Sequence, residues 1–451
     1  MRLIRTINGD HLTPITIYLR LKDSRVLLES DPAAGGKNSI IGIAPADELT
    51  FKDGIFNSRR DSFLCGDPLK ELEKYVRAED DLTADLPFQG GAIGYAGYDV
   101  AACYEDIGEL PPDELGIADL DFYLFETFLI YDHEKELVSI ICSNAYSQVG
   151  EAELKRRMAD ILAELMVTNR EETKTIPAVK FPYTSNFSKE GFEKVVAAAK
   201  ELIDQGDLFQ MVPSQRLKAT MTLAPFDYYR QLRKSNPSEY MYYLDFGETK
   251  VIGTSPESLV TVRNGRITTN PIAGTRKRGM TPEEDDILAS ELLADEKERA
   301  EHMMLVDLSR NDLSKVAEIG SVAVTSLMTI EKYRYVMHIC SLVEGCLEKG
   351  QTPMDALKAT LPVGTVSGAP KIRAMQRIYQ FETVRRNLYA GAVGYYSLDE
   401  QADFAIAIRT MVVKEDTAYV QAGAGIVYDS VPEKEYYETL HKAKALLEVS
   451  R

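Results

Sequence analysis

The stretch DEKERAEHMMLVDLSRNDL (residues 295–313) carries two glutamates, Glu298 and Glu301, three positions apart. Side chains three or four positions apart lie on one face of an α-helix. The apolar residues that follow Glu301 predict that this helix is buried over much of its surface, and a buried carboxylate needs a partner. The stretch therefore predicts a packed helix with two acidic side chains on one face.

A second stretch repeats this pattern near the end of the chain. In VPEKEYYETLHKAKALLEV (431–449), Glu435 and Glu438 are three positions apart, and Lys442 follows four positions later. Two such faces brought together form an oxygen-rich cage, which suits Mg²⁺. The alternative, that each pair is only a solvated helix face, stays open because spacing alone does not exclude it.

Three glycine-bearing loops are candidate anion sites. They are NPIAGTRKRG (270–279), LPVGTVSGAPKIRAM (361–375) and QAGAGIVYDS (421–430). Glycine lets backbone N–H groups approach a ligand closely, and successive N–H groups and helix N-termini attract anions. Arg409, in FAIAIRT, can bind a carboxylate with two hydrogen bonds. A plain turn is the alternative for each loop, and a structural ion pair is the alternative for Arg409; no loop matches a nucleotide-binding pattern.

Few residues are candidates for acid–base chemistry. His338 lies in the apolar stretch YRYVMHICSL, where a histidine is either a base or a satisfied core residue. Glu257, in GTSPESLV, follows a predicted strand. A carboxyl group partly removed from water stays protonated and can act as a general acid.

The composition disfavours two classes of partner. The 451 residues carry a formal net charge of −18 at pH 7, which argues against binding to nucleic acid and against docking on an anionic membrane. No stretch approaches the roughly 18 consecutive apolar residues of a membrane span. The five cysteines form no CxxC pair, which indicates reduced thiols. The N-terminus MRLIRTINGDHLTP has no apolar leader, so the sequence predicts a cytoplasmic protein.

The pattern of apolar residues divides the chain into three regions. Residues 1–146 read as short strands, among them HLTPITIYLRL (11–21), because β-branched and aromatic residues recur between Gly, Pro and Asp. Residues 147–183 are predicted to hold one helix and a polar linker. Residues 184–451 alternate predicted helices and strands, with one continuous helix over 283–309. The other predicted helices are 149–168, 188–206, 352–361, 370–380 and 432–449.

Six ordered motifs together resemble the chorismate-binding enzyme family. They are PIAGTRKRG, DEKERAEHMMLVDLSRND, PVGTVSGAPKIRAM, AIRT, QAGAGIV and SVPEKEYYETLHKA. The resemblance covers residues 184–446 densely and the N-terminal half more loosely. It implies an α+β fold, a two-lobed α/β sandwich of mixed or antiparallel β-sheets flanked by helices. It also implies that residues 1–146 are a regulatory and partner-binding region and that residues 184–451 are the chorismate-binding catalytic region.

Three positions separate the activities found in this family. One is the loop PVGTVSGAPK, which resembles the anthranilate form more than the PGGSITGAPK form of the aminodeoxychorismate enzymes. Ala273, in PIAGT, lies where the aminodeoxychorismate synthases commonly have a nucleophilic lysine. Gln210, in QMVPSQ, replaces the lysine with which isochorismate and salicylate synthases activate water. Both residues resemble those of the anthranilate synthases, Mg²⁺-dependent carbon–oxygen lyases that make anthranilate and pyruvate from chorismate and ammonia in tryptophan biosynthesis. The alternatives are an aminodeoxychorismate synthase component and a non-catalytic chorismate-binding subunit.

The resemblance also implies a role for each candidate residue. The catalytic residues would be Glu257, which protonates the departing C4 hydroxyl, His338, which assists loss of the C2 proton, and Thr275. The enolpyruvyl carboxylate would be held by Arg409 and Tyr389. The Mg²⁺ ligands would be Glu298, Glu301, Glu435 and Glu438. The substrate-binding residues would be Gly274, Thr275, Thr365, Tyr389, Arg409, Gly423, Gly425 and Lys442. Chorismate is a dicarboxylate, so it needs a cation to lie beside four carboxylates.

Two partners besides chorismate are implied. No cysteine of the chain lies in the nucleophile turn of a glutaminase, so ammonia is expected from a separate glutamine amidotransferase subunit. RVLLES and NPSEYMYY resemble the two segments that bind the feedback inhibitor L-tryptophan in this family, with Glu239 in place of a proline. A purely structural role for LLES is the alternative. The inhibitor-binding residues implied are Leu28, Glu29, Ser30, Pro237, Tyr240 and Met241.

Overall fold

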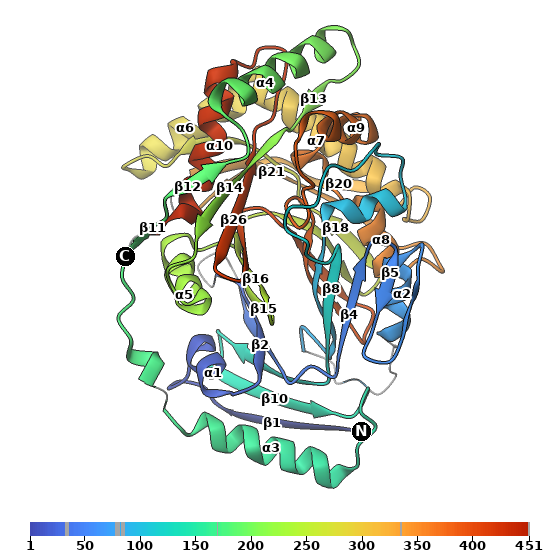
Figure 1. Ribbon diagram of the computed structural model, residues 1–451, viewed down its shortest axis with the longest axis vertical. Helices are drawn as coiled ribbons and strands as arrows, with labels where there is room; N and C mark the ends of the chain where they lie inside the picture. The colour runs from blue at the N-terminus through green and yellow to red at the C-terminus, as the bar shows by residue number, and fades with distance from the viewer. Residues whose placement is uncertain (32–35, 77–81, 83–85, 169, 334–335, 450–451) are drawn as a thin grey trace.

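Two large β-sheets, packed face to face and flanked by helices, form the computed structural model (Figure 1). The structure describes residues 1–31, 36–76, 82, 86–168, 170–333 and 336–449. Within these ranges, every strand pairing of the two sheets is antiparallel. The predicted α+β sandwich is therefore confirmed.

The first sheet has 11 strands. Their order across the sheet is β1 (Arg2–Asn8), β10 (Leu137–Ser143), β9 (Thr127–Asp132), β3 (Asn38–Ile43), β2 (Ser24–Glu29), β15 (Tyr240–Phe246), β16 (Thr249–Ser255), β25 (Thr410–Lys414), β26 (Thr417–Gly423), β14 (Ser214–Thr220) and β12 (Tyr183–Ser185).

The second sheet has 12 strands. Their order is β19 (Ile272–Lys277), β21 (Val336–Cys346), β18 (Arg266–Thr269), β17 (Ser258–Arg263), β24 (Ala402–Ile406), β23 (Ala392–Ser397), β7 (Gly91–Ala96), β8 (Leu120–Phe125), β4 (Asp47–Lys52), β5 (Ile55–Asn57) and β6 (Ser62–Leu64), with β20 (Ala323–Lys332) paired to β21. Two short pairs lie apart from both sheets: β11 (Val179–Lys180) with β27 (Glu448–Val449), and β13 (Gln210–Met211) with β22 (Gly368–Ala369).

Both sheets combine strands from the start and from the end of the chain. In the first sheet, β2 pairs with β15 so that Leu28 lies opposite Tyr242. In the second sheet, β7 pairs with β23. The boundary predicted between residues 1–146 and 184–451 therefore divides the sequence but neither sheet. The regulatory and catalytic roles of these two regions stay predictions.

Helices lie on the outer faces of the two sheets and between their ends (Figure 1). They are α1 (Pro14–Arg20), α2 (Pro68–Tyr75), η2 (Tyr98–Cys103), α3 (Glu151–Leu165), η3 (Arg170–Thr173), α4 (Lys189–Asp204), α5 (Pro225–Ser235), α6 (Pro282–Ala294), α7 (Glu296–Ser314), α8 (Pro353–Thr360), η4 (Gly364–Val366), α9 (Lys371–Phe381) and α10 (Pro432–Leu447). The predicted helices that correspond to α3, α4, α8, α9 and α10 are confirmed.

Two predicted elements are wrong. The stretch 11–21 forms helix α1 and not a strand, because Thr13 and Thr16 form a reciprocal capping box and Pro14 occupies the first turn. The continuous helix predicted over 283–309 is two helices. Asp295 adopts an extended conformation between them, and its carboxylate accepts the N–H groups of Lys297 and Glu298, which starts α7.

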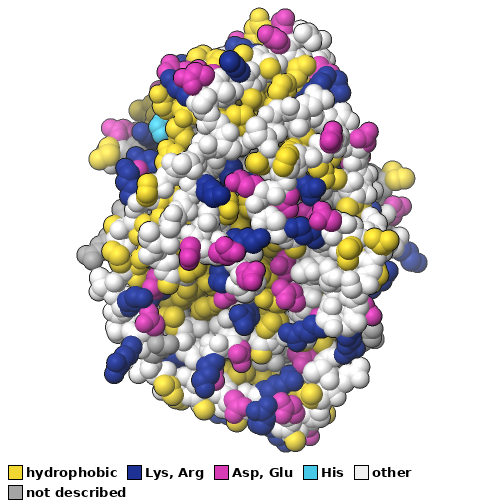
Figure 2. Space-filling model, in the orientation of Figure 1, with side chains coloured by type: hydrophobic (Ala, Val, Ile, Leu, Met, Phe, Trp, Pro, Cys, Tyr) yellow, Lys and Arg dark blue, Asp and Glu magenta, His cyan; other side chains and the backbone are white. Residues whose placement is uncertain are grey.

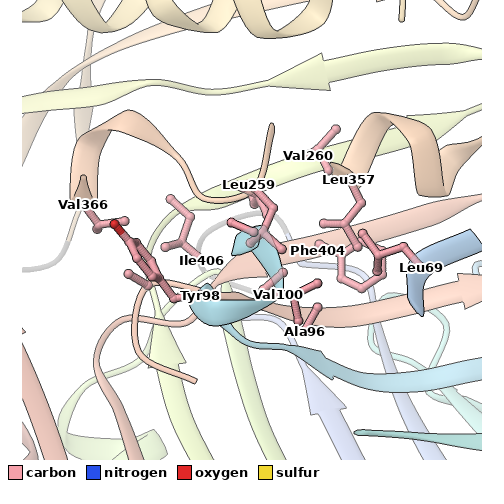
Figure 3. Close-up of a cluster of buried hydrophobic side chains, with 14 of the residues drawn as sticks. Leu69, Ala96, Tyr98, Val100, Leu259, Val260, Leu357, Val366, Phe404 and Ile406 are labelled. Carbon is pink, nitrogen blue, oxygen red and sulfur yellow. The ribbon is translucent and has the colours of Figure 1, made fainter. Parts of the chain in front are cut away.

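Within the part of the chain that the structure describes, three large apolar cores hold these layers together, and a small fourth one lies around Leu292, Met337 and Ile339. One lies between the two sheets, and a second lies between the first sheet and helices α1, α3, α5 and α10. The largest packs the second sheet against α2, α4, α7, α8 and α9, and Figure 3 shows part of it around Leu259 and Phe404. Among the described helices, none combines the length and the apolar character needed to cross a membrane. On the face shown in Figure 2, Lys and Arg side chains lie interspersed with Asp and Glu.

Candidate functional site

The acidic faces of α7 and α10 come together. Glu298, Glu301 and Glu435 are each half-buried, whereas Glu438 is 48% exposed. Burial raises the pKa of Glu301, and the negative charges of Glu298 and Glu435 add to the rise. Burial also raises the pKa of Glu435, and Glu438 adds to that rise. Glu301 on α7 and Glu435 on α10 are therefore near enough for their charges to interact, and the role of the four glutamates as metal ligands stays a prediction.

Basic side chains hold three of these carboxylates. Arg276 lies 3.3 Å from Glu298, Lys297 lies 3.8 Å from Glu301, and Lys442 lies 2.8 Å from Glu438. Within the described ranges, no group of three or more His, Cys, Asp or Glu side chains is close enough to hold a metal ion as it stands. The donor set still suits Mg²⁺ chemically, because it offers only carboxylate oxygens and because a divalent cation would relieve the mutual repulsion.

Glu257 occupies the turn between β16 and β17 and is only 8% exposed. Burial raises its pKa to about 8, against the smaller opposing effects of the Thr365 hydroxyl and the Lys442 ammonium. The side chain is therefore mostly protonated at neutral pH and can donate a proton. Thr365 and Lys442, both predicted to line the substrate, lie beside this acid.

His338 lies on β21 directly opposite Thr275 on β19. Its Nδ1 atom is 2.9 Å from the carbonyl oxygen of Gly274 and 3.1 Å from the hydroxyl oxygen of Thr275. A carbonyl oxygen can only accept, so this contact assigns the hydrogen to Nδ1 and leaves Nε2 as a free acceptor. Burial lowers the pKa of His338, which keeps the ring neutral and able to take up a proton.

Gly274 connects this histidine to the acidic faces. Its φ of +66° lies in the left-handed region, where a residue with a side chain is strained. A Cβ atom at this position would also lie 3.1 Å from a carboxylate oxygen of Glu298. Glycine is therefore required where the loop that holds the predicted substrate-binding residues Gly274 and Thr275 passes Glu298, a predicted metal ligand.

The cationic end of the site is built from β26, helix α10 and the residue that precedes β25. Arg409 has a φ of +50° and donates from Nη1 to the carbonyl oxygen of Lys442 at 3.1 Å. Lys442 donates to the carbonyl oxygen of Gly423 at 3.0 Å. The Tyr389 hydroxyl would lie 2.9 Å from a Cβ atom on Gly423, so it faces the same turn. These contacts bring together the residues predicted to hold the enolpyruvyl carboxylate.

The structure gives the amide of Gln210 surroundings that the sequence does not predict. Gln210 lies against Gly425, where a Cβ atom would be 3.0 Å from Nε2 of its amide. The other end of that amide, Oε1, is buried, and no described residue donates a hydrogen bond to it. A buried acceptor without a partner is costly, which marks this atom as a position where a ligand can donate.

The predicted inhibitor residues gather at a second place. Leu28, Glu29, Ser30, Tyr240 and Met241 line a cavity of about 270 Å³. Pro237, also predicted to bind the inhibitor, does not line this cavity. The other residues that line it include Lys37, Glu239, Arg263, Tyr395 and Asp403.

The Glu29 carboxylate already has partners. It accepts hydrogen bonds from Nε and Nη2 of Arg233, each at 2.8 Å, and from the Tyr229 hydroxyl at 2.5 Å. All three donor atoms lie on α5, which covers the outer face of the first sheet. Glu29 therefore anchors this strand to a helix, and its carboxylate is not a free charge for a ligand.

The chain has extensive relatives among characterised proteins. The family model for chorismate binding enzymes matches residues 23–448. Anthranilate synthase component 1 of Lactococcus lactis subsp. lactis (strain IL1403) is 50% identical over 456 residues, which covers 100% of both chains. Aminodeoxychorismate synthase component 1 of Bacillus subtilis (strain 168) is 40% identical over 439 residues, which covers 95% of this chain and 93% of the relative.

A solved structure agrees with these relatives. Anthranilate synthase component I from Streptococcus pneumoniae TIGR4 superposes with a TM-score of 0.88 at 47% sequence identity. The superposition covers 98% of this chain and 99% of that one. Because the family model spans nearly all of the sequence and these relatives align along their whole length, the chain belongs to the chorismate binding enzyme family.

Proposed function

We propose that this chain is the ammonia-using component of an anthranilate synthase, which converts chorismate and ammonia to anthranilate, pyruvate and water. The observation that carries the proposal is that a protonated acid, Glu257, and a neutral base, His338, each lie near enough to one of two cationic residues for its charge to act on them. Lys442 acts on Glu257, Arg409 acts on His338, and Arg409 donates to the carbonyl oxygen of Lys442. The full-length similarity to an anthranilate synthase component supports the same conclusion.

Binding of chorismate would begin with its two carboxylates. Arg409, Tyr389 and Lys442 would hold the enolpyruvyl carboxylate, since their polar atoms converge on the turn at Gly423. Glu298, Glu301, Glu435 and Glu438 would hold Mg²⁺ next to the ring carboxylate. When bound, Mg²⁺ supplies a Lewis acid that neutralises this carboxylate and draws electrons from the ring.

Amination would use Gln210 and Glu257. The partnerless amide oxygen of Gln210 would accept a hydrogen bond from ammonia and orient its lone pair. Attack at ring C2 shifts the double bonds and breaks the bond from C4 to its hydroxyl group. Glu257 would give its proton to this oxygen, which leaves as water.

Aromatisation would use His338. The Gly274 carbonyl holds the ring with Nδ1 protonated, so Nε2 would remove the proton from C2. The electron pair of the C–H bond forms the aromatic ring, and the enolpyruvyl ether at C3 leaves as pyruvate. Thr275 would help to fix the imidazole through its hydroxyl oxygen.

The proposal extends to two partners. A separate glutamine amidotransferase subunit would supply ammonia, because all five cysteines are free thiols and none lies in a nucleophile turn. L-Tryptophan would bind as an inhibitor in the cavity that Leu28, Tyr240 and Met241 help to line. Free thiols in every described cysteine also support a cytoplasmic location.

One other activity is favoured by a specific observation. The relative from Bacillus subtilis is an aminodeoxychorismate synthase component at 40% identity over most of both chains. That reaction would give 4-amino-4-deoxychorismate and would release no pyruvate. Ala273 argues against it, because the chain has no lysine at the position where those enzymes commonly have a nucleophile.

Product identification tests the proposal. The purified chain is incubated with chorismate, Mg²⁺ and ammonium chloride, and the products are separated by chromatography while pyruvate is assayed enzymatically. We expect equal amounts of anthranilate and pyruvate. 4-Amino-4-deoxychorismate without pyruvate would establish the aminodeoxychorismate activity, and chorismate binding without turnover would establish a non-catalytic subunit.

A further inference from the structure

A buried arginine outside the predicted site ties two of its segments together. The Arg386 side chain is 0% exposed. Its Nη1 donates to the carbonyl oxygen of Val366 at 2.7 Å, and its Nη2 donates to the carbonyl oxygen of Val212 at 2.6 Å. Val366 lies between Thr365 and Ser367, and Val212 follows Gln210 by two residues. One guanidinium group therefore binds the backbone of two segments of the site, the one that holds Thr365 and the one that holds Gln210.

Its ionic partner reaches a third segment. Glu382, which is 2% exposed, accepts from Nη2 of Arg386 at 2.6 Å. The same carboxylate oxygen accepts from the backbone N–H and from the hydroxyl of Ser214, both at 2.8 Å. Ser214 lies opposite Gly423 in the pairing of β14 with β26. Through Ser214, the ion pair of Arg386 and Glu382 is therefore connected to the turn at Gly423, where the predicted carboxylate-binding residues lie.

The guanidinium also packs against two tyrosine rings. Its central carbon lies 4.7 Å from the ring centroid of Tyr98 and 5.4 Å from that of Tyr389, within the range of a cation–π contact. The Tyr389 hydroxyl faces Gly423. Arg386 therefore sets the position of a side chain that is predicted to touch the substrate, without facing the substrate itself.

We infer that Arg386 and Glu382 form a positioning pair that sets the shape of the wall holding the enolpyruvyl carboxylate of chorismate. A buried ion pair gives little net stability compared with apolar side chains of the same size, because both charges lose their water. The pair instead fixes geometry. The planar guanidinium donates to two carbonyl oxygens and one carboxylate at once, which an ammonium group cannot do in the same arrangement. The inference rests on the proposed function for the identity of the ligand.

The substitution Arg386→Lys tests the inference. Lysine keeps the charge beside Glu382 but cannot bind both carbonyl oxygens in the same geometry. The matched control is Arg20→Lys, far from the site in α1. Arg20 also pairs with a mostly buried carboxylate, Glu172 at 2.8 Å, and also donates to a backbone carbonyl, Leu165 at 2.6 Å.

Chorismate affinity is the primary measurement, by isothermal titration calorimetry with Mg²⁺ and without ammonia. We expect Arg386→Lys to weaken binding about tenfold or more and to raise KM more than it lowers kcat, since a displacement of about 1 Å is costly at a binding site. We expect Arg20→Lys to leave binding within about twofold of the parent chain. A folded Arg386→Lys protein with parental affinity and KM would overturn the inference.

A second variant covers the case in which Arg386→Lys does not fold. Ser214→Ala removes the hydroxyl that joins Glu382 to β14 and that also accepts from Nε2 of Gln421 at 2.8 Å, and it leaves the backbone hydrogen bond to Glu382 in place. We expect it to weaken chorismate binding by about threefold to tenfold while circular dichroism stays parental. Unchanged affinity in this variant would also overturn the inference. Turnover by the parent chain is scored separately: a product other than anthranilate would refute the proposed function, while the affinity comparison would still decide the role of the pair.

Discussion

Replacing Glu257 by glutamine is expected to stabilise the folded protein while it removes the acid needed for the reaction. The pKa of this carboxyl is about 8 in the fold, against an ordinary value of 4.5. The folded state therefore binds the proton more tightly than the unfolded state does. Above pH 4.5 the unfolded chain gains from releasing that proton, so stability falls as the pH rises from 4.5 to 8 and then levels off.

The size of this loss of stability follows from the difference between the pH and the ordinary pKa of 4.5. At pH 7 the group is 2.5 pH units above 4.5, and each unit corresponds to roughly 1.4 kcal/mol, so the cost is about 3 kcal/mol. Glutamine has a similar shape and carries no ionisable proton. Relative to the parent, Glu257→Gln should therefore gain almost nothing near pH 4.5 and about 3 kcal/mol at pH 7.

Urea denaturation at several pH values between 4.5 and 8 measures this difference. The control is Glu248→Gln, at an exposed position in the turn after β15, which should show no such growth with pH. Glu257→Gln should also lose about 10²-fold to 10⁴-fold in kcat. In the parent chain, kcat should fall above pH 8, because Glu257 then loses its proton. A stability difference that stays constant from pH 5 to pH 7.5 would refute the argument that burial keeps Glu257 protonated.

Three further outcomes are expected. Glu301→Gln should raise the Mg²⁺ concentration needed for half-maximal activity by about tenfold or more, since it removes one carboxylate from the meeting of α7 and α10; an unchanged Mg²⁺ titration would remove this residue from the metal site. His338→Met should slow aromatisation more than amination, so that 2-amino-2-deoxyisochorismate accumulates in chromatograms, and a variant that forms anthranilate without this intermediate would exclude the assigned base. Met241→Thr should weaken inhibition by L-tryptophan by about tenfold and leave the KM for chorismate unchanged, because Met241 lines the cavity of about 270 Å³ and not the proposed chorismate site. Equal inhibition of the variant and the parent chain would place the inhibitor elsewhere.

The sequence predicts the parts of the site that depend on local spacing. The pairs Glu298 with Glu301 and Glu435 with Glu438 lie on helix faces because their separation matches the helical repeat. The glycine of PIAGT is required by its positive φ at Gly274. In each of these cases the information lies within a few residues, so a pattern is sufficient.

Two boundaries were predicted wrongly for a local reason. The apolar residues of the stretch 11–21 resemble a strand, but the threonine pair Thr13 and Thr16 starts a helix by satisfying its first N–H groups. Asp295 acts in the same way at the start of α7. A search for capping residues, made before the search for apolar periodicity, would have found both helix starts.

The remaining features depend on contacts between distant parts of the chain. Arg386 binds carbonyl oxygens that lie 20 and 174 positions away, and a carbonyl is present at every residue, so no sequence pattern marks such partners. The partnerless oxygen of Gln210 is likewise a property of its surroundings. Glu29 matches a ligand-binding segment in the sequence, yet α5 satisfies its carboxylate.

The interleaving of early and late strands in both sheets restricts how such proteins can be recombined. Removal of the first 146 residues would strip β2 from β15 and β7 from β23, and would leave two long hydrogen-bonding edges open to aggregation. Chimeras that graft the cavity beside Leu28 and Met241 from one relative onto the proposed chorismate site of another must therefore exchange strands in neighbouring pairs. A single crossover in the linker after α3 would join strands that did not evolve to lie side by side.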